Sequence, residues 1–194
     1  MALADWARDG RLGLRFSGSG GQGILLAATV LAEAATALGY HVVQTQSYGP
    51  EARGGASRSE VVIAEEEIDY PEVPHPDISL CLSQAAYDKY AADTRPGGLL
   101  VVDSDLVASD ERVAHCVLRA LPFTATARGR LGKVVVTNIV ALGALTALSG
   151  VLPPAAVEEA VLRRVPERFR DLNREAFRAG AELAAAAGAA AGAR

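Results

Sequence analysis

Short apolar runs alternate along the chain with longer segments in which apolar residues recur every three or four positions. The short runs predict buried β-strands, and the longer segments predict helices with one apolar face. Strands are expected at residues 12–16, 41–46, 61–64, 68–70, 78–82, 99–102 and 113–118. Helices are expected at residues 24–38, 84–91, 131–148, 155–164 and 167–187. This alternation predicts one α/β domain of three layers with a mostly parallel, Rossmann-like sheet.

The order of the expected elements indicates how the chain is organised into one domain. The first strand, the first helix and the second strand should form a right-handed parallel crossover. The polar, glycine-rich segment 47–59 is expected to be a loop, and the two short strands that flank an acidic turn after it are compatible with a hairpin. A single domain is expected over residues 1–194, with its core at about 11–180. The Ala/Gly-rich residues 184–194 are expected to be flexible.

Composition narrows the class of protein. Half of the 194 residues are apolar and the net charge is only −4, which is typical of a folded globular domain and gives no general attraction to nucleic acid. Two cysteines, Cys81 and Cys116, cannot hold a zinc or iron–sulfur site of four thiolates and suggest no disulfide framework, so we expect a cytoplasmic protein. The uncharged residues 134–153 contain Asn138 and end in two prolines, which favours a buried helix over a membrane span.

A glycine cluster follows the first strand: Gly18, Ser19, Gly20, Gly21, Gln22 and Gly23. It matches G-x-G-x-x-G between a strand and a helix, as in dinucleotide-binding proteins. The acidic residue that should close the second strand and hold a ribose is absent, because that strand ends in Gln44, Thr45 and Gln46. Three interpretations stay open: a nucleotide site, a tight turn for packing, and contact with another phosphate or a partner chain.

A second cluster follows the second strand and begins with Ser47 and Tyr48. It continues through Gly49, Pro50, Glu51, Ala52, Arg53, Gly54 and Gly55. Both clusters should share one edge of the sheet, where open α/β sheets bind ligands. A long loop with an aromatic residue and several glycines is expected to bind something, and Arg53 could clamp a carboxylate or phosphate. The alternative is a surface pair between Glu51 and Arg53.

Other polar residues receive structural interpretations. The three histidines lack metal-ligand spacing, and both cysteines are expected to be inert buried thiols. Asp103 and Asp105 are expected to form a turn or a helix cap, with acid–base chemistry as the alternative. A basic group of Arg128, Arg130 and Lys133 suits either an anion or solvent.

Several ordered motifs together resemble a known family. These are FSGSGGQGILLAATVLAEAA, QSYGPEARGGASRSEVVIA, PDISLCLSQAAYDKY and PGGLLVVDSDLV, with Asn138 before ALGAL and Asn173 before AFRAG. Their order from Gly13 to Gly180 resembles the gamma subunit of 2-oxoacid:ferredoxin oxidoreductases. The second glycine cluster resembles the 2-oxoglutarate branch of that family more than the pyruvate branch.

The resemblance implies a reversible reaction in which a 2-oxoacid, coenzyme A and oxidised ferredoxin give acyl-CoA, carbon dioxide and reduced ferredoxin. It implies that alpha and beta subunits hold thiamine diphosphate and Mg²⁺, and that cysteine-rich parts, such as a delta subunit, hold iron–sulfur clusters. This chain is then expected to bind no cofactor alone, to reach ferredoxin through the complex, and to help frame the coenzyme A region. Its two glycine clusters become binding or interface residues, and no catalytic residue is implied.

Two other functions stay open: a self-sufficient nucleotide-binding oxidoreductase and a non-enzymatic binding module. The alanine- and leucine-rich last third predicts an exposed apolar patch and an interface above about 2,000 Å² with other subunits. The isolated chain is expected to form a homodimer. Neither a nucleic acid nor a membrane is an expected partner.

Overall fold

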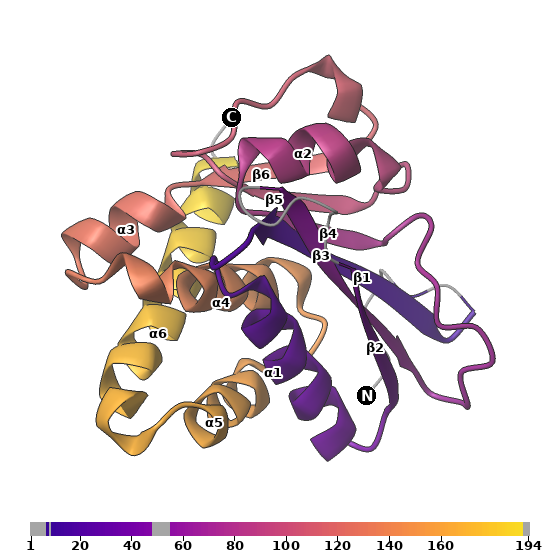
Figure 1. The fold of residues 1–194 in the computed structure, drawn as a ribbon, viewed down its shortest axis with the longest axis horizontal. Helices are drawn as coiled ribbons and strands as arrows, with labels where there is room; N and C mark the ends of the chain where they lie inside the picture. The colour runs from indigo at the N-terminus through magenta and orange to yellow at the C-terminus, as the bar shows by residue number, and fades with distance from the viewer. Residues whose placement is uncertain (1–6, 8, 48–54, 192–194) are drawn as a thin grey trace.

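The computed structural model describes residues 7, 9–47 and 55–191, which form one six-stranded sheet in the order β2-β3-β1-β4-β5-β6 (Figure 1). The strands are β1 (Arg11–Ser19), β2 (His41–Ser47), β3 (Ala56–Ala64), β4 (Ile78–Cys81), β5 (Leu99–Asp103) and β6 (Val117–Leu121). The α-helices are α1 (Ile24–Ala37), α2 (Gln84–Tyr90), α3 (Phe123–Gly129), α4 (Thr137–Ser149), α5 (Pro154–Arg164) and α6 (Arg170–Ala191). Four short 3-10 helices connect them at Ala91–Asp93, Glu111–Val113, Val134–Val136 and Glu167–Phe169.

The sheet is mostly parallel, as the sequence predicts. β1, β4, β5 and β6 run parallel as successive neighbours, whereas β3 is antiparallel to both of its neighbours, β1 and β2. β2 is therefore parallel to β1, but β3 lies between them. All the parallel strands end at one edge of the sheet, and β3 begins there, because Ser19 pairs with Ala56 and Ser47 pairs with Arg58.

Five details of the predicted elements are wrong. β3 begins at Ala56, so residues 56–59 are strand and not loop, and residues 68–70 form no strand. The strand expected at 113–118 instead spans Val117–Leu121, after a 3-10 turn. Helix α3 was not expected, and only a 3-10 turn and α4 occupy residues 134–149.

The helices lie on both faces of the sheet and complete the three layers (Figure 1). α1, α3, α4, α5 and α6 contribute to one large apolar core against one face, together with alternate residues of β1 such as Leu12, Leu14 and Phe16. α2 packs on the other face, in a smaller cluster around Tyr87 and Leu100. The 3.6-residue and two-residue periods thus place the apolar side chains where the sequence expects them.

Helix α4 is the most buried helix, and glycine explains how closely α6 crosses it. A Cβ atom at Gly143 would lie 2.0 Å from the carbonyl oxygen of Phe177, and one at Gly180 would lie 1.9 Å from that of Val140. Only glycine permits backbones to approach so closely. Within the described residues, no helix is long and apolar enough to cross a membrane. α6 extends through Ala191, and flexibility of the remaining tail stays a prediction.

Candidate functional site

The chain leaves β1 and β4 toward opposite faces of the sheet, because α1 packs on one face and α2 on the other. Between the carboxyl ends of these neighbouring strands, an open α/β sheet has a crevice in which ligands and partners bind. In this protein, the first glycine cluster follows β1 on one side of this crevice, and Leu82 follows β4 on the other side. The sequence-predicted loop therefore lies where the fold is best suited to recognition.

Gln22 holds the glycine loop against β4. Its side-chain oxygen accepts a hydrogen bond from the backbone N–H of Ser19 at 2.6 Å, and its amide nitrogen donates to the carbonyl of Leu82 at 2.7 Å. Its own backbone N–H donates to the Ser19 carbonyl at 3.2 Å. One amide side chain thus defines the shape of the loop and its distance from the neighbouring strand.

The four glycines of the loop differ in their surroundings. A Cβ atom at Gly18 would lie 2.6 Å from the Gln22 side-chain oxygen, and one at Gly23 would lie 2.5 Å from the Asn138 side-chain nitrogen. Gly23 also has a φ of 72°, and its carbonyl accepts a hydrogen bond from Asn138 at 3.0 Å. Gly20 and Gly21 have open space around them. The outer glycines serve packing, whereas the inner two leave the backbone accessible.

Helix α1 begins directly after this loop with no side-chain cap and no acidic residue in its first turn. Its first backbone N–H groups and its dipole favour a negative group. β2 carries no carboxylate at its end, and Gln44 instead donates hydrogen bonds to Thr29 and Ser59. The geometry therefore supports contact with an anion or a partner chain better than the ribose grip of a dinucleotide site.

A crevice of about 310 Å³ opens beside the loop. We call it the switch-point crevice, because the chain turns to opposite faces of the sheet after β1 and β4. It is lined by Gly21, Gln22, Leu82, Leu106, Thr124, Arg128, Val134, Val135 and Thr137. Three of its apolar side chains are strongly exposed, with 42% of Leu106, 47% of Val134 and 79% of Val135 accessible to solvent. Among the described residues, Arg128 is the one charged side chain that lines it.

Asp103 and Asp105 fix the α3 side of the crevice. Asp103 is fully buried and accepts hydrogen bonds from the backbone N–H of Thr124 at 3.2 Å and from its hydroxyl at 2.6 Å. Asp105 accepts one from the backbone N–H of Ala125 at 2.6 Å. Burial raises the pKa of Asp103 from its ordinary value, although these donors oppose the shift. The expected capping role is confirmed, and α3 begins on these two carboxylates.

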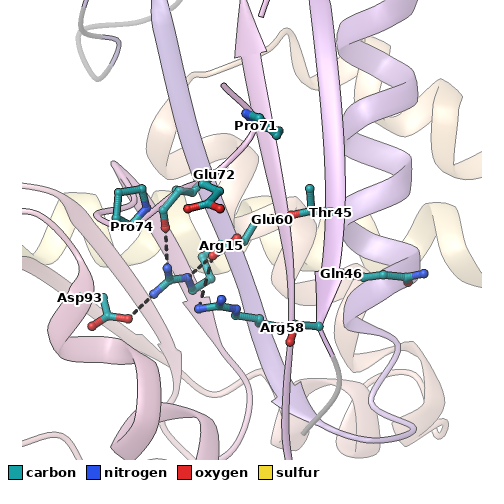
Figure 2. A pocket seen from close by; sticks show the side chains of 11 residues that line it. Arg15, Thr45, Gln46, Arg58, Glu60, Pro71, Glu72, Pro74 and Asp93 are labelled. Atoms are coloured by element: carbon teal, nitrogen blue, oxygen red, sulfur yellow. Dashed lines mark hydrogen bonds and ion pairs between the residues drawn. The ribbon is translucent and has the colours of Figure 1, made fainter. Parts of the chain in front are cut away.

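A larger cavity of about 590 Å³, the polar cleft, lies over β1, β2 and β3 on the face away from α1. At its base, the side chain of Arg15 is only 2% exposed and donates to Glu60 at 2.8 Å, to Asp93 at 2.5 Å and to the Val73 carbonyl at 2.5 Å. Arg58 lies 3.7 Å from Glu60 (Figure 2). This network was not predicted from the sequence, where its one signal is an arginine inside the apolar run LGLRF.

The second glycine cluster is described only at its ends. Ser47 ends β2 opposite Arg58, and the half-buried Gly55 precedes Ala56, which pairs with Ser19. Both glycine clusters are therefore anchored at the same edge of the sheet, as predicted. The remaining candidate residues of this cluster lie outside the described residues: Tyr48, Gly49, Pro50, Glu51, Arg53 and Gly54.

The cysteines and histidines show no sign of chemistry. Cys81 is buried, which raises its pKa to about 11, and the half-buried Cys116 also has a raised pKa because of desolvation. His75 and His115 contact the backbone carbonyls of Asp93 and Thr94. Among the residues that the structure describes, no group of three histidine, cysteine or acidic side chains could hold a metal ion.

Comparison with known proteins decides the family. The family described as pyruvate ferredoxin/flavodoxin oxidoreductase matches residues 13–183. The chain belongs to this family. Its relatives include subunit KorC of 2-oxoglutarate synthase from Methanocaldococcus jannaschii, which is 49% identical over 88% of this chain and 92% of its own length. The corresponding subunit from Archaeoglobus fulgidus is 41% identical over 88% of this chain and 86% of its own length.

Solved structures of the family share this fold. The gamma subunit of a keto/oxoacid ferredoxin oxidoreductase from Geobacter sulfurreducens is 48% identical, with a TM-score of 0.82 over 91% of this chain and 98% of that chain. The 2-oxoglutarate:ferredoxin oxidoreductase of Magnetococcus marinus is 26% identical, with a TM-score of 0.81 over 92% of this chain and 32% of that chain. The resemblance to gamma subunits and the predicted fold class are both confirmed.

Proposed function

We propose that this chain is the gamma subunit of a 2-oxoglutarate:ferredoxin oxidoreductase, which converts 2-oxoglutarate, coenzyme A and oxidised ferredoxin into succinyl-CoA, carbon dioxide and reduced ferredoxin. The observation that carries the proposal is the similarity to 2-oxoglutarate synthase subunits, which extends over nearly the full length of both chains. The arrangement of the site supports it, because an accessible glycine loop and an apolar crevice suit recognition, and no catalytic side chain is needed.

The cofactors of this reaction belong on other subunits. The residues of this chain do not fit an iron–sulfur cluster, because Cys81 is one of only two cysteines and its thiol is buried beneath α2. Within the described residues, no three histidine, cysteine or acidic side chains are grouped so that they could hold a metal ion. Alpha and beta subunits would hold the thiamine cofactor, and a cysteine-rich part, such as a delta subunit, would pass electrons to ferredoxin.

The role of this chain is then to bind and to position. The first glycine cluster offers accessible backbone at Gly20 and Gly21 beside the positive end of α1. The second cluster, including Arg53, begins and ends at the same edge. We assign both clusters to contacts with coenzyme A or with the alpha subunit that frames it.

Reconstitution tests the proposal. We expect the chain alone to show no 2-oxoacid oxidation, and the complex co-purified with its partner subunits to reduce ferredoxin with 2-oxoglutarate and coenzyme A. Pyruvate should be a poorer substrate by kcat/KM. Activity of the isolated chain, or micromolar binding of NAD(P)H or a flavin to it, would instead favour a self-sufficient nucleotide-binding oxidoreductase.

A further inference from the structure

Exposed apolar side chains gather at the switch-point crevice. Seven large apolar residues are strongly exposed in the part of the chain that the structure describes: Leu25, Leu38, Tyr70, Leu106, Val134, Val135 and Phe169. Three of them, Leu106, Val134 and Val135, line this single crevice. Scattered exposed apolar residues need no explanation, but a contiguous group marks an interaction site.

The group is held rigidly. Asn138 ties the start of α4, just after Val134 and Val135, to the carbonyl of Gly23. The buried Asp103 holds Thr124 on the opposite wall, so α3 cannot shift without loss of its cap. A surface whose side chains are already fixed loses little conformational entropy when it binds, which favours a specific partner.

One guanidinium, that of Arg128, lines the crevice. Arg128 has no hydrogen bond or ion pair within the described residues, and the uncapped N-terminus of α1 lies on the other side of the crevice. No carboxylate belongs to the described lining, and the nearby Asp103 and Asp105 accept hydrogen bonds from the first turn of α3. A guanidinium beside an apolar surface suits a carboxylate that flanks an apolar segment of a partner.

The related proteins indicate which partner this is. In the Magnetococcus marinus enzyme, the region that matches this chain is 32% of a longer chain, and in the ketoisovalerate oxidoreductase subunit VorA of Methanothermobacter thermautotrophicus it is 36%. Those chains join this domain covalently to about twice its length of additional polypeptide. In a separate subunit, the contact must instead be non-covalent, so it needs a surface of its own.

We propose that the switch-point crevice is the docking surface for the subunit that corresponds to the additional part of those longer chains, and that it receives an apolar segment flanked by a carboxylate. This inference rests on the proposed function and adds the face that binds and the chemistry of the bound segment. The polar cleft is larger, but Arg15 is already paired with acidic side chains at its base, and none of the seven strongly exposed apolar residues named above lines it.

A matched pair of substitutions tests the surface. Leu106 and Leu38 are exposed to 42% and 43%, but Leu38 follows the end of α1, away from the crevice. In the co-expressed complex, Leu106→Asp should weaken association with the partner subunit by at least about tenfold, because it places a charge in an apolar contact. Leu38→Asp should leave association unchanged. Association is measured by titration of the purified partner, and thermal melts of both variants should match that of the wild type.

A second variant tests the charge. Arg128→Glu should also weaken association, and the loss should be larger at low ionic strength than at high ionic strength. If the wild-type subunits do not assemble at all, the proposed function fails. If they assemble and Leu106→Asp associates as well as Leu38→Asp, the docking surface is wrong while the proposed function stands. If Leu106→Asp disrupts only a homodimer of the isolated chain, the occupant is a second copy and the inference is overturned.

Discussion

The polar cleft and the switch-point crevice use their surfaces in opposite ways. The volume of the cleft is almost twice that of the crevice, yet its buried arginine, Arg15, already donates hydrogen bonds to Glu60, Asp93 and a backbone carbonyl. The crevice is smaller and apolar, and Arg128 and the first N–H groups of α1 are left without a side-chain partner among the described residues. These polar groups without a partner, and not the larger volume of the cleft, indicate that the crevice is the binding surface.

This difference follows from position in the fold. Arg15 lies in the central strand β1 on the face away from α1, where its network joins β1 to Glu60 of β3, to Asp93 and to the carbonyl of Val73. The crevice lies instead at the carboxyl ends of the parallel strands. The first backbone N–H groups of a helix that begins there find no hydrogen-bond partner within the sheet. The cleft therefore concerns stability, and the crevice concerns assembly.

The largest expected effect comes from the cleft. Arg15→Met leaves Glu60 buried without its main partner and should lower the free energy of unfolding by about 3 kcal/mol, because an unpaired buried charge is costly. Chemical denaturation of the isolated subunit measures this loss. The partner-binding affinity of the folded protein should not change.

The double variant Arg15→Met/Glu60→Leu sharpens this prediction. Removal of both charges should restore part of the stability, since an apolar pair can replace a buried ion pair. As a control, Arg112→Met removes exposed ion pairs with Asp88 and Asp110 and should leave the midpoint of unfolding nearly unchanged. If Arg15→Met behaves like the control, the network in the cleft does not stabilise the fold.

The mostly parallel sheet and its helices could be predicted because their apolar residues follow regular periods. The errors lie where local pattern and tertiary role differ. Residues 56–59 read as a polar loop, but β3 is enclosed between β1 and β2, and Ser59 finds its partner in Gln44 of the neighbouring strand. Helix α3 is short and is capped by Asp103 and Asp105, which lie about twenty positions earlier in the sequence.

The candidate site was predictable in part. The first glycine cluster was recognisable because strand, turn and helix follow one another directly in the sequence. The crevice wall at Leu106, Val134 and Val135 was not, because its residues come from two separate connections and only the folded chain brings them together. Asn138 carried a signal as a polar residue in an apolar helix, and its bond to Gly23 supplies the reason.

The glycine loop provides the next effect in size. Gly23→Ala should cost about 2–3 kcal/mol of unfolding free energy, because alanine tolerates the φ of 72° poorly and its Cβ would displace the Asn138 amide. Gly20→Ala, in open space, should be nearly neutral to stability. Thermal or chemical melts of the two variants compare them directly.

This pair also separates folding from binding. Gly20→Ala should lower affinity for the partner subunit or for coenzyme A while stability is retained, if accessible backbone at the loop is used for recognition. Equal losses of stability for both variants would show that the loop is only a tight turn.

The smallest expected effect is the reactivity of the two thiols. It tests how rigid the sheet is between the polar cleft and the switch-point crevice. Cys81 ends β4 and lies 3.1 Å from the Ser17 hydroxyl, in the sheet that separates the cleft from the helical core. Burial raises its pKa to about 11, so at pH 8 only about one molecule in a thousand carries the reactive thiolate, compared with about one in four for a free cysteine. We expect iodoacetamide to label Cys116 of the native subunit slowly and to leave Cys81 unlabelled, whereas denatured protein takes up two labels. Mass spectrometry of peptides after timed labelling distinguishes the sites. Labelling of Cys81 at a rate comparable to that of Cys116 would mean that β4 and α2 separate frequently, and the crevice could not then be the rigid surface inferred here.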